Sequence, residues 1–291
     1  MNNDFIFALE KTKGIGITTI NKILDISSDF NEFLENEEEI LKINKINKTV
    51  FNEIYSMKNS EDFENYKEAI SKMDIDLINS NKEKFPVKLK CIEKVPFSLH
   101  LRGDNELLKN KSVAIVGSRK SSKYGDEVAF KIAKFLSNRG YTVVSGMAEG
   151  IDTSAHLGAL EGKGSTIAVV GSGLDYVYPK KNVKLYMDIV KKGLVISEFF
   201  LGVKPVSYNF PRRNRIISAI ADFLIVIEAT KKSGSMLTVN YALKQGKDVF
   251  AVPGEIFSKT SEGTNLLIRD GAYPLISLED LSEYLDNLRN F

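Results

Sequence analysis

One segment of this 291-residue sequence combines positive charges with aromatic rings and contains no acidic residue. It runs from Phe199 to Arg215 and reads FFLGVKPVSYNFPRRNR. Its cations are Lys204, Arg212, Arg213 and Arg215, and the aromatic ring that precedes the arginines is Phe210. On a loop, cations that follow phosphates and rings that stack on bases suit single-stranded nucleic acid. Alternatively, Pro211 opens a helix, some arginines pair with carboxylates of the protein and the rings belong to the core. We expect at least one structural arginine, but four cations without an acid favour nucleic-acid binding.

Two shorter segments have the composition of anion sites. The first, GSRKSSKYG, supplies glycines, hydroxyls and cations, and the second, SGS, begins a predicted helix. Backbone amides at a helix start can receive an anion, and an arginine can contact two of its oxygens. The residues concerned are Gly117, Ser118 and Arg119 in the first segment and Ser233, Gly234 and Ser235 in the second. Gly-Ser-Arg has two equally weighted interpretations. It is either a plain strand-to-helix turn or a phosphate site. Neither segment contains a dinucleotide fingerprint or a Walker loop.

Other loops are expected to support the same pocket. SGMAEGIDTSAH and GSGLDYVYP each follow an apolar run, and their glycines permit a close approach of the backbone. The supporting residues are Gly146, Gly150, His156, Gly171, Gly173, Glu228 and Thr238. His156 is either a base or ligand contact, or a histidine that ties its helix to a loop by a hydrogen bond, and the second interpretation is favoured. Glu228 has two equally weighted interpretations. It is either an acceptor of a hydrogen bond from a sugar or an arginine, or a structural acid paired with an arginine.

The elements that must position these loops alternate in type after Lys111. Short β-rich apolar runs alternate with amphipathic helical segments. The runs are SVAIVG, YTVVSG, STIAVVG, LVISEF, FLIVIEA, DVFAVP and AYPLI, and the helical segments are 124–138, 152–161, 181–192, 212–221, 235–245 and 263–270. This order predicts an α/β fold, an extended Rossmann-like parallel or mixed sheet with helices on both faces. Ligands of such sheets bind at the carboxyl ends of the strands, where the loops described above lie.

The first part of the chain differs in charge and in pattern. Apolar residues at three- and four-residue spacing predict a small all-α domain over 1–75, either SAM-like or helix-hairpin-helix-like. Residues 76–110 are expected to form a linker with short strands, and 111–291 the Rossmann-like DNA-binding domain. The whole chain has a net charge of +2, but residues 1–84 carry −6 and the remainder +8. The acidic first part therefore masks a basic α/β domain.

Composition excludes several classes of protein. A single cysteine, Cys91, cannot form an internal disulfide, and the N-terminus lacks the apolar core of a signal peptide. No apolar stretch is long enough to span a bilayer, and two histidines with one cysteine leave no structural zinc cluster. We therefore expect a soluble cytoplasmic protein with no membrane contact, no metal and no cofactor.

The motifs taken in order resemble the DNA-processing protein A family (DprA, also called Smf). They are VGSR, YG, SGMAEGID with AH, GSGLDYVYP, ISEF, FPRRNRII, VIEA, SGSMLT, VPG and GTNLLIRDGA, and they cover about 111–277. The resemblance implies a Rossmann-like domain that binds single-stranded DNA in a basic pocket, with no catalytic reaction. By position it carries Gly117, Ser118 and Arg119 onto the family's phosphate loop. Phe210, Arg212, Arg213 and Arg215 fall on its second basic loop, with Lys204 nearby.

The resemblance also implies partners. Members load the recombinase RecA onto incoming DNA, which they protect, during natural transformation, in the presence of single-strand-binding protein. They form homodimers, and the segment from 265 to 273 lies where the self-association surface is expected. The residues of this surface are Asn265, Leu266, Leu267, Ile268 and Tyr273. We expect this chain to be a recombination mediator with these partners.

Two alternatives from other classes stay open. One is a nucleoside monophosphate phosphoribohydrolase resembling the LOG family, although SGSMLT replaces the PGGxGT-type loop that such enzymes use. The other is a sensor that binds a free mononucleotide in the same pocket. Release of free base would identify the enzyme, and a thermal shift with mononucleotides alone would identify the sensor.

Overall fold

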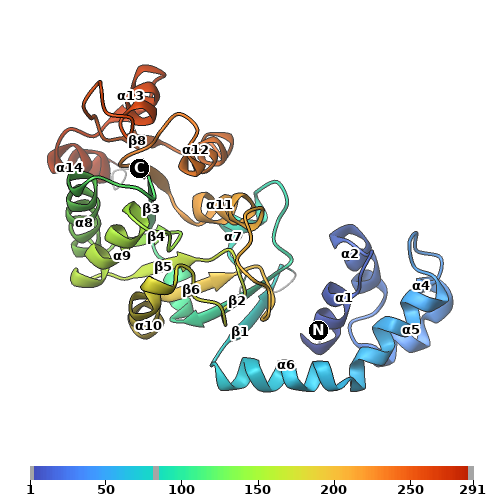
Figure 1. Ribbon diagram of the computed structural model, residues 1–291. Coiled ribbons are helices and arrows are strands. Elements are labelled where there is room, and N and C mark those ends of the chain that lie inside the picture. The colour runs from blue at the N-terminus through green and yellow to red at the C-terminus, as the bar shows by residue number, and fades with distance from the viewer. Residues whose placement is uncertain (1–2, 81–84, 288–291) are drawn as a thin grey trace. The chain divides into compact units, whose positions relative to one another are not determined.

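The computed structural model describes residues 3–80 and 85–287, which form two compact units divided between Leu77 and Ile78 (Figure 1). Because the positions of the two units relative to one another are not determined, each is described by itself. Among the described residues, no helix combines the length and apolarity needed to cross a membrane.

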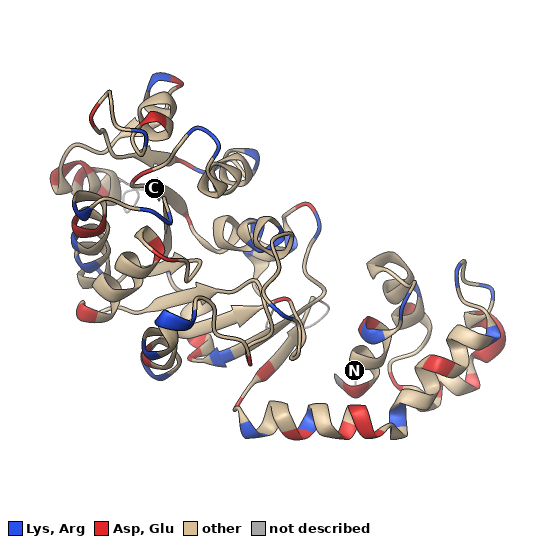
Figure 2. Cartoon of the chain, in the orientation of Figure 1, with Lys and Arg blue, Asp and Glu red and all other residues tan. Residues whose placement is uncertain are grey.

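The first unit is helical, as its sequence pattern predicts. Its elements are α1 (Asn3–Lys11), α2 (Ile17–Ile26), α3 (Phe30–Glu35), α4 (Glu37–Ile40), α5 (Lys48–Ser56), a 3₁₀ turn at Met57–Asn59 and α6 (Glu61–Lys72). The starts of α3, α5 and α6 are fixed by side-chain caps; at α3, Asp29 accepts hydrogen bonds from the amides of Asn31 and Glu32. Buried phenylalanines, including Phe33 stacked on Phe51, form the core. Figure 2 shows acidic residues on several of these helices.

The second unit is built on one sheet with the strand order β1-β2-β6-β5-β4-β3-β7-β8-β9. The strands are β1 (Asp76–Asn79), β2 (Ser98–Gly103), β3 (Ser112–Val116), β4 (Thr142–Ser145), β5 (Thr166–Val169), β6 (Leu194–Ser197), β7 (Phe223–Val226), β8 (Val249–Ala251) and β9 (Tyr273–Pro274). From β6 to β9 neighbouring strands are parallel, whereas β2 runs antiparallel to β6. The seven predicted strands are thus all present, and the predicted fold class is confirmed.

Helices cover both faces of the sheet (Figure 1). They are α7 (Val87–Lys90), α8 (Lys123–Asn138), α9 (Ile151–Glu161), α10 (Val183–Lys192), α11 (Asn209–Ile220), α12 (Gly234–Lys244), α13 (Glu262–Arg269) and α14 (Leu278–Asn287), with short 3₁₀ turns at Asn105–Lys109 and Lys180–Asn182. Alternate residues of each strand point to opposite faces. In β3, Ala114 and Val116 therefore pack with α11 and α12, while Val113 and Ile115 pack with α8, α9 and α14.

The strand order places a topological switch point at the centre of the sheet. From β3 the chain first adds β4, β5 and β6 on one side, and later adds β7, β8 and β9 on the other. Loops after β3 and β7 therefore diverge and leave a crevice above the carboxyl ends of these strands. Residues 76–110, expected to be a linker with short strands, supply β1, β2 and α7.

Candidate nucleic-acid-binding pocket

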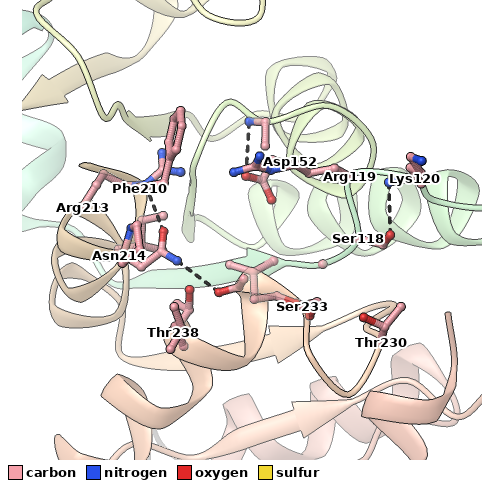
Figure 3. A pocket seen from close by; sticks show the side chains of 18 of the residues that line it. Ser118, Arg119, Lys120, Asp152, Phe210, Arg213, Asn214, Thr230, Ser233 and Thr238 are labelled. Carbon is pink, nitrogen blue, oxygen red and sulfur yellow. Dashed lines mark hydrogen bonds between the residues drawn. The ribbon is translucent and has the colours of Figure 1, made fainter. Parts of the chain in front are cut away.

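A cavity of about 770 Å³ lies at this switch point (Figure 3). One wall is the loop after β3, which carries Ser118, Arg119 and Lys120. The opposite wall is the loop after β7 with the start of α12, and the first turn of α11 closes a third side. The sequence-predicted segments GSR, FPRRNR and SGS, which lie far apart in the chain, therefore meet around one cavity.

The loop after β3 is held by hydrogen bonds, and its arginine is exposed at the wall of the cavity. The Ser118 hydroxyl accepts a hydrogen bond from the Lys120 amide at 3.1 Å, and the Ser118 carbonyl accepts one from the Ile151 amide at 3.3 Å. Gly150 has a φ of +73°, and a Cβ there would lie 2.5 Å from the Ser118 carbonyl oxygen, so glycine is required. Arg119 and Lys120 are exposed beside the cavity and are available to an anion.

Two aromatic rings and a guanidinium group lie in contact at the mouth of the cavity. The guanidinium of Arg119 lies over the ring of Phe210, 5.0 Å from its centroid, and Tyr178 lies on Phe210 at 5.8 Å between centroids. Gly171 permits this position of the ring, since a Cβ at Gly171 would meet Phe210 at 3.0 Å. Tyr178 was not among the pocket residues predicted from the sequence, although its place in the GSGLDYVYP loop was a usable signal. Rings and a guanidinium together are the groups on which nucleobases stack.

The start of α12 adds amide groups to the opposite wall. The first amides of a helix have no intrahelical acceptor, and the helix dipole favours an anion at this end. The Ser233 hydroxyl makes no cap hydrogen bond to these amides and instead pairs with the Ser235 hydroxyl. Asn214 of α11 donates to the Gly234 carbonyl at 3.2 Å and so fixes α12 against α11. Thr238, one turn further, is buried and lines the cavity floor.

Arg213 is buried beneath the cavity and serves the scaffold. Its guanidinium donates to the Gly146 carbonyl at 2.6 Å and to the Val169 carbonyl, which ties α11 to the ends of β4 and β5. A Cβ at Gly146 would lie 2.6 Å from the guanidinium, so this glycine makes room for it. Burial lowers the pKa of Arg213 to about 10, and buried Asp152 opposes that shift. One guanidinium nitrogen of Arg213 is thus bonded to two backbone carbonyls and its Nε to Asn214, and a direct contact of Arg213 with DNA stays a prediction.

Arg215 and Arg212 share an acid but differ in exposure. Arg215 forms a buried ion pair with Glu198, which directly follows β6, and 8% of its side chain is exposed. Arg212 lies 3.9 Å from the same carboxylate and over the Phe199 ring, but 58% of its side chain is exposed. Arg215 is thus bonded to Glu198 within the protein and its contact with DNA stays a prediction, while the side chain of Arg212 is available to a ligand.

His156 and Glu228 serve the scaffold. His156 is fully buried in α9, and its Nδ1 lies 2.7 Å from the Thr166 hydroxyl of β5. Burial and, to a lesser degree, Arg213 lower its pKa to about 3, so it is neutral at physiological pH. Glu228 accepts hydrogen bonds from the Ser122 hydroxyl at 2.6 Å and the Ser122 amide at 2.9 Å. It thus holds the start of α8, and no arginine that the structure describes forms an ion pair with it.

The remaining predicted residues lie outside the cavity wall. Lys204 is exposed on the loop before α11 and does not line the cavity. Gly173 is buried, and a Cβ there would meet the Phe200 carbonyl oxygen at 2.5 Å. Asn265 exchanges two hydrogen bonds with Gly254, while Leu266, Leu267 and Ile268 are half-buried in α13. Tyr273 of β9 is exposed and stacks on Phe250.

Comparison with known proteins shows the family to which this chain is similar. A family model for DNA recombination-mediator protein A matches residues 76–286. Protein Smf of Escherichia coli is 41% identical over 214 residues, 73% of this chain and 56% of that protein. DNA processing protein DprA of Streptococcus pneumoniae is 44% identical over 197 residues, 68% of this chain and 70% of that protein. The chain thus spans little more than half the length of one of these relatives.

Two solved structures share the fold. The X-ray structure of DNA processing protein A from Streptococcus pneumoniae has a TM-score of 0.81 and 37% identity, covering 97% of this chain and 98% of that one. DNA processing protein A from Helicobacter pylori, described for its single-stranded-DNA binding mode, has a TM-score of 0.69 and 30% identity, covering 76% and 99%. With its sequence, its sheet and its motifs in agreement, the chain belongs to the DNA recombination-mediator protein A family.

Proposed function

We propose that this protein binds single-stranded DNA in the pocket between β3 and β7 and acts there as a recombination mediator. The observation that carries the proposal is the stack of Arg119 on Phe210 at the mouth of the cavity, opposite the start of α12. A phosphate between Arg119 and the α12 amides would leave its base beside the Phe210 ring. A base paired within a duplex cannot offer its face in this way, so the arrangement favours a single strand.

The finer proposal concerns the process that this binding serves. Family membership supports a protein that covers incoming DNA during natural transformation, displaces single-strand-binding protein and loads RecA as a homodimer. The assay is the rate of RecA filament assembly on oligonucleotides coated with single-strand-binding protein. We expect acceleration by the wild-type chain and none by a variant whose pocket no longer binds DNA.

The direct test is binding of labelled oligo-dT at several salt concentrations. A single-stranded ligand gives a slope of log affinity against log salt of about −0.7 for each phosphate contact. We expect the double variant Arg119→Ala, Arg212→Ala to bind more weakly and with a shallower slope. Unchanged binding of this variant would refute the proposal. Lys131→Ala is the matched control, because Lys131 is an exposed cation of α8 paired with Glu127 outside the pocket.

The two alternatives are separable in the same samples. A phosphoribohydrolase would release free base from a nucleoside monophosphate, and its absence at high protein concentration would reject the enzyme. The commitment of His156 to Thr166 and of Glu228 to Ser122 favours binding over hydrolysis. A mononucleotide sensor would show a thermal shift with mononucleotides and none with oligo-dT.

A further inference from the structure

A second combination of lysines and an aromatic ring lies beyond the far wall of the cavity. We call it the distal patch, and it comprises Lys231, Lys232, Ile256, Phe257 and Lys259. The first two residues lie on the loop between β7 and α12, and the other three on the loop between β8 and α13. Figure 2 shows positive charge on the loop that precedes α12. The sequence analysis did not assign any of these residues.

Backbone hydrogen bonds join the two loops and connect them to the cavity. The Ala229 amide donates to the Thr260 carbonyl at 2.7 Å, and the Gly263 amide donates to the Ala229 carbonyl at 2.7 Å. Thr230 and Thr260, the neighbours of the patch residues in each loop, both line the cavity. The distal patch therefore begins where the cavity wall ends.

The apolar side chains of the patch are held outward. Phe257 is 95% exposed and Ile256 is 78% exposed. Their loop is fixed on both sides, by the two hydrogen bonds between Gly254 and Asn265 and by the contact of the Ser258 and Thr260 hydroxyls at 3.0 Å. Isolated exposed apolar residues are common, but two adjacent ones at the tip of a fixed loop indicate a binding surface.

The charges on the two loops of the patch indicate what this surface binds. Lys231, Lys232 and Lys259 are exposed, and none of them forms an ion pair with any residue that the structure describes. Glu255 is the acidic residue of the same loop, and Glu262 follows at the start of α13. The patch thus has three lysines and one aromatic ring on two joined loops, a composition that suits a single strand rather than an apolar protein surface.

We propose that the distal patch is a second stacking platform, on which a base of a single strand rests on Phe257 after the strand leaves the pocket. Lys231, Lys232 and Lys259 contact the phosphates of this part of the strand. This inference rests on the proposed function, since it continues the path of the same ligand. It predicts that short oligonucleotides use the pocket alone and longer ones use both places.

The absence of tryptophan from the sequence gives a direct test. Phe257→Trp creates a protein with a single indole, whose fluorescence reports on the patch alone. Tyr178→Trp places the single indole at the pocket instead, and Ile276→Trp places it at another exposed apolar position as the control. On addition of oligo-dT of 6 and of 20 nucleotides, we expect the Tyr178→Trp indole to be quenched by both lengths. The Phe257→Trp indole should be quenched only by the longer oligonucleotide, and the Ile276→Trp indole by neither.

Affinities provide the second readout. Phe257→Ala should weaken binding of the 20-mer by about 5- to 150-fold, the range expected for one lost stacked base, and leave the 6-mer unchanged. Phe257→Leu should behave like Phe257→Ala, because it keeps the apolar bulk but loses the ring, whereas Phe257→Tyr should restore binding.

Two results would overturn the inference while leaving the pocket proposal intact. One is equal binding of the 20-mer by wild type, Phe257→Ala and Phe257→Leu while the Tyr178→Trp indole still responds. The other is a change from dimer to monomer in sedimentation of Phe257→Ala with no quenching of Phe257→Trp by DNA, which would make the patch a contact with a second copy. If DNA does not quench the Tyr178→Trp indole and no protein binds the 6-mer, the proposed function itself is contradicted.

Discussion

Two pairs of arginines, each with one member in the lining of the pocket, differ in almost every physical respect. Arg119 and Arg212 are exposed, and each lies over a phenylalanine ring. Arg213 and Arg215 are buried and bind backbone carbonyls and Glu198. In the sequence FPRRNR, neighbouring arginines thus belong to different sets.

The arginine-rich motif FPRRNR therefore contributes in two separate ways, to the stability of the fold and to the binding of a ligand. The buried pair fastens α11 across the ends of β4, β5 and β6, so that Phe210 is presented over Gly171. The exposed pair supplies donors that a ligand can use without breaking bonds of the protein. Loss of the first set should damage the fold, and loss of the second should damage binding alone.

The largest expected effect is on the free energy of unfolding when Arg215 is truncated. Arg215→Ala leaves the buried Glu198 carboxylate without its main partner and should lower this free energy by about 3–5 kcal/mol, measured by urea denaturation. The double variant Arg215→Met, Glu198→Leu replaces the pair by apolar groups and should recover most of the loss. Recovered folding without recovered oligo-dT binding would place Arg215 among the DNA-binding residues.

A smaller effect concerns the pH dependence of stability through His156. Its pKa is lowered from 6.5 to about 3 in the folded protein, so the unfolded chain binds the proton more readily. Stability contributed by the neutral imidazole is therefore present above pH 6.5 and is lost as the pH falls toward 3. Between pH 6.5 and 4.5 the loss attributable to this group is about 2 kcal/mol. Denaturation of wild type and His156→Gln at several pH values isolates it, and identical slopes would contradict the burial of His156.

The exposed set is tested by Arg119→Ala, which should change binding and spare the fold. Loss of a charge-assisted hydrogen bond of about 1.5–3 kcal/mol corresponds to about 10- to 150-fold weaker binding of oligo-dT. The salt slope should fall by about 0.7, while the free energy of unfolding stays within about 0.5 kcal/mol of wild type. A loss of stability comparable with that of Arg215→Ala would remove the distinction between the two sets.

Arg212→Ala should give the smallest effect. Its side chain is 58% exposed and lies 3.9 Å from Glu198, so a contact with phosphate is screened and partly offset. We expect a loss of about 2- to 5-fold in affinity, again with a shallower salt slope. Anisotropy measured at low and high salt checks this, and a loss larger than that of Arg119→Ala would reverse the ranking.

The parallel sheet was predictable from sequence because its strands are continuous apolar runs followed by glycine-rich turns. The antiparallel β2 was harder to assign, since SLHLRG follows Pro96 and carries His100 and Arg102 within the strand. The loops of the pocket were also predictable, because the carboxyl ends of parallel strands meet at one edge of the sheet.

Which arginines are buried and which are exposed was not predictable from their spacing. Burial of Arg213 depends on a missing side chain at Gly146, and burial of Arg215 depends on Glu198, both on other loops. Likewise, the contact of the Tyr178 ring with the Phe210 ring depends on the position of the loop after β5. Such contacts link residues that are remote in sequence, and no periodicity reports them.

The measurement that tests the central claim most directly is a crystal structure of the chain with a short oligo-dT. We expect a phosphate bound between the Arg119 guanidinium and the first amides of α12, with a base against the Phe210 ring and the Arg213 and Arg215 contacts unchanged. An ordered strand bound elsewhere on the molecule, with Arg119 and Phe210 free of it, would contradict the account.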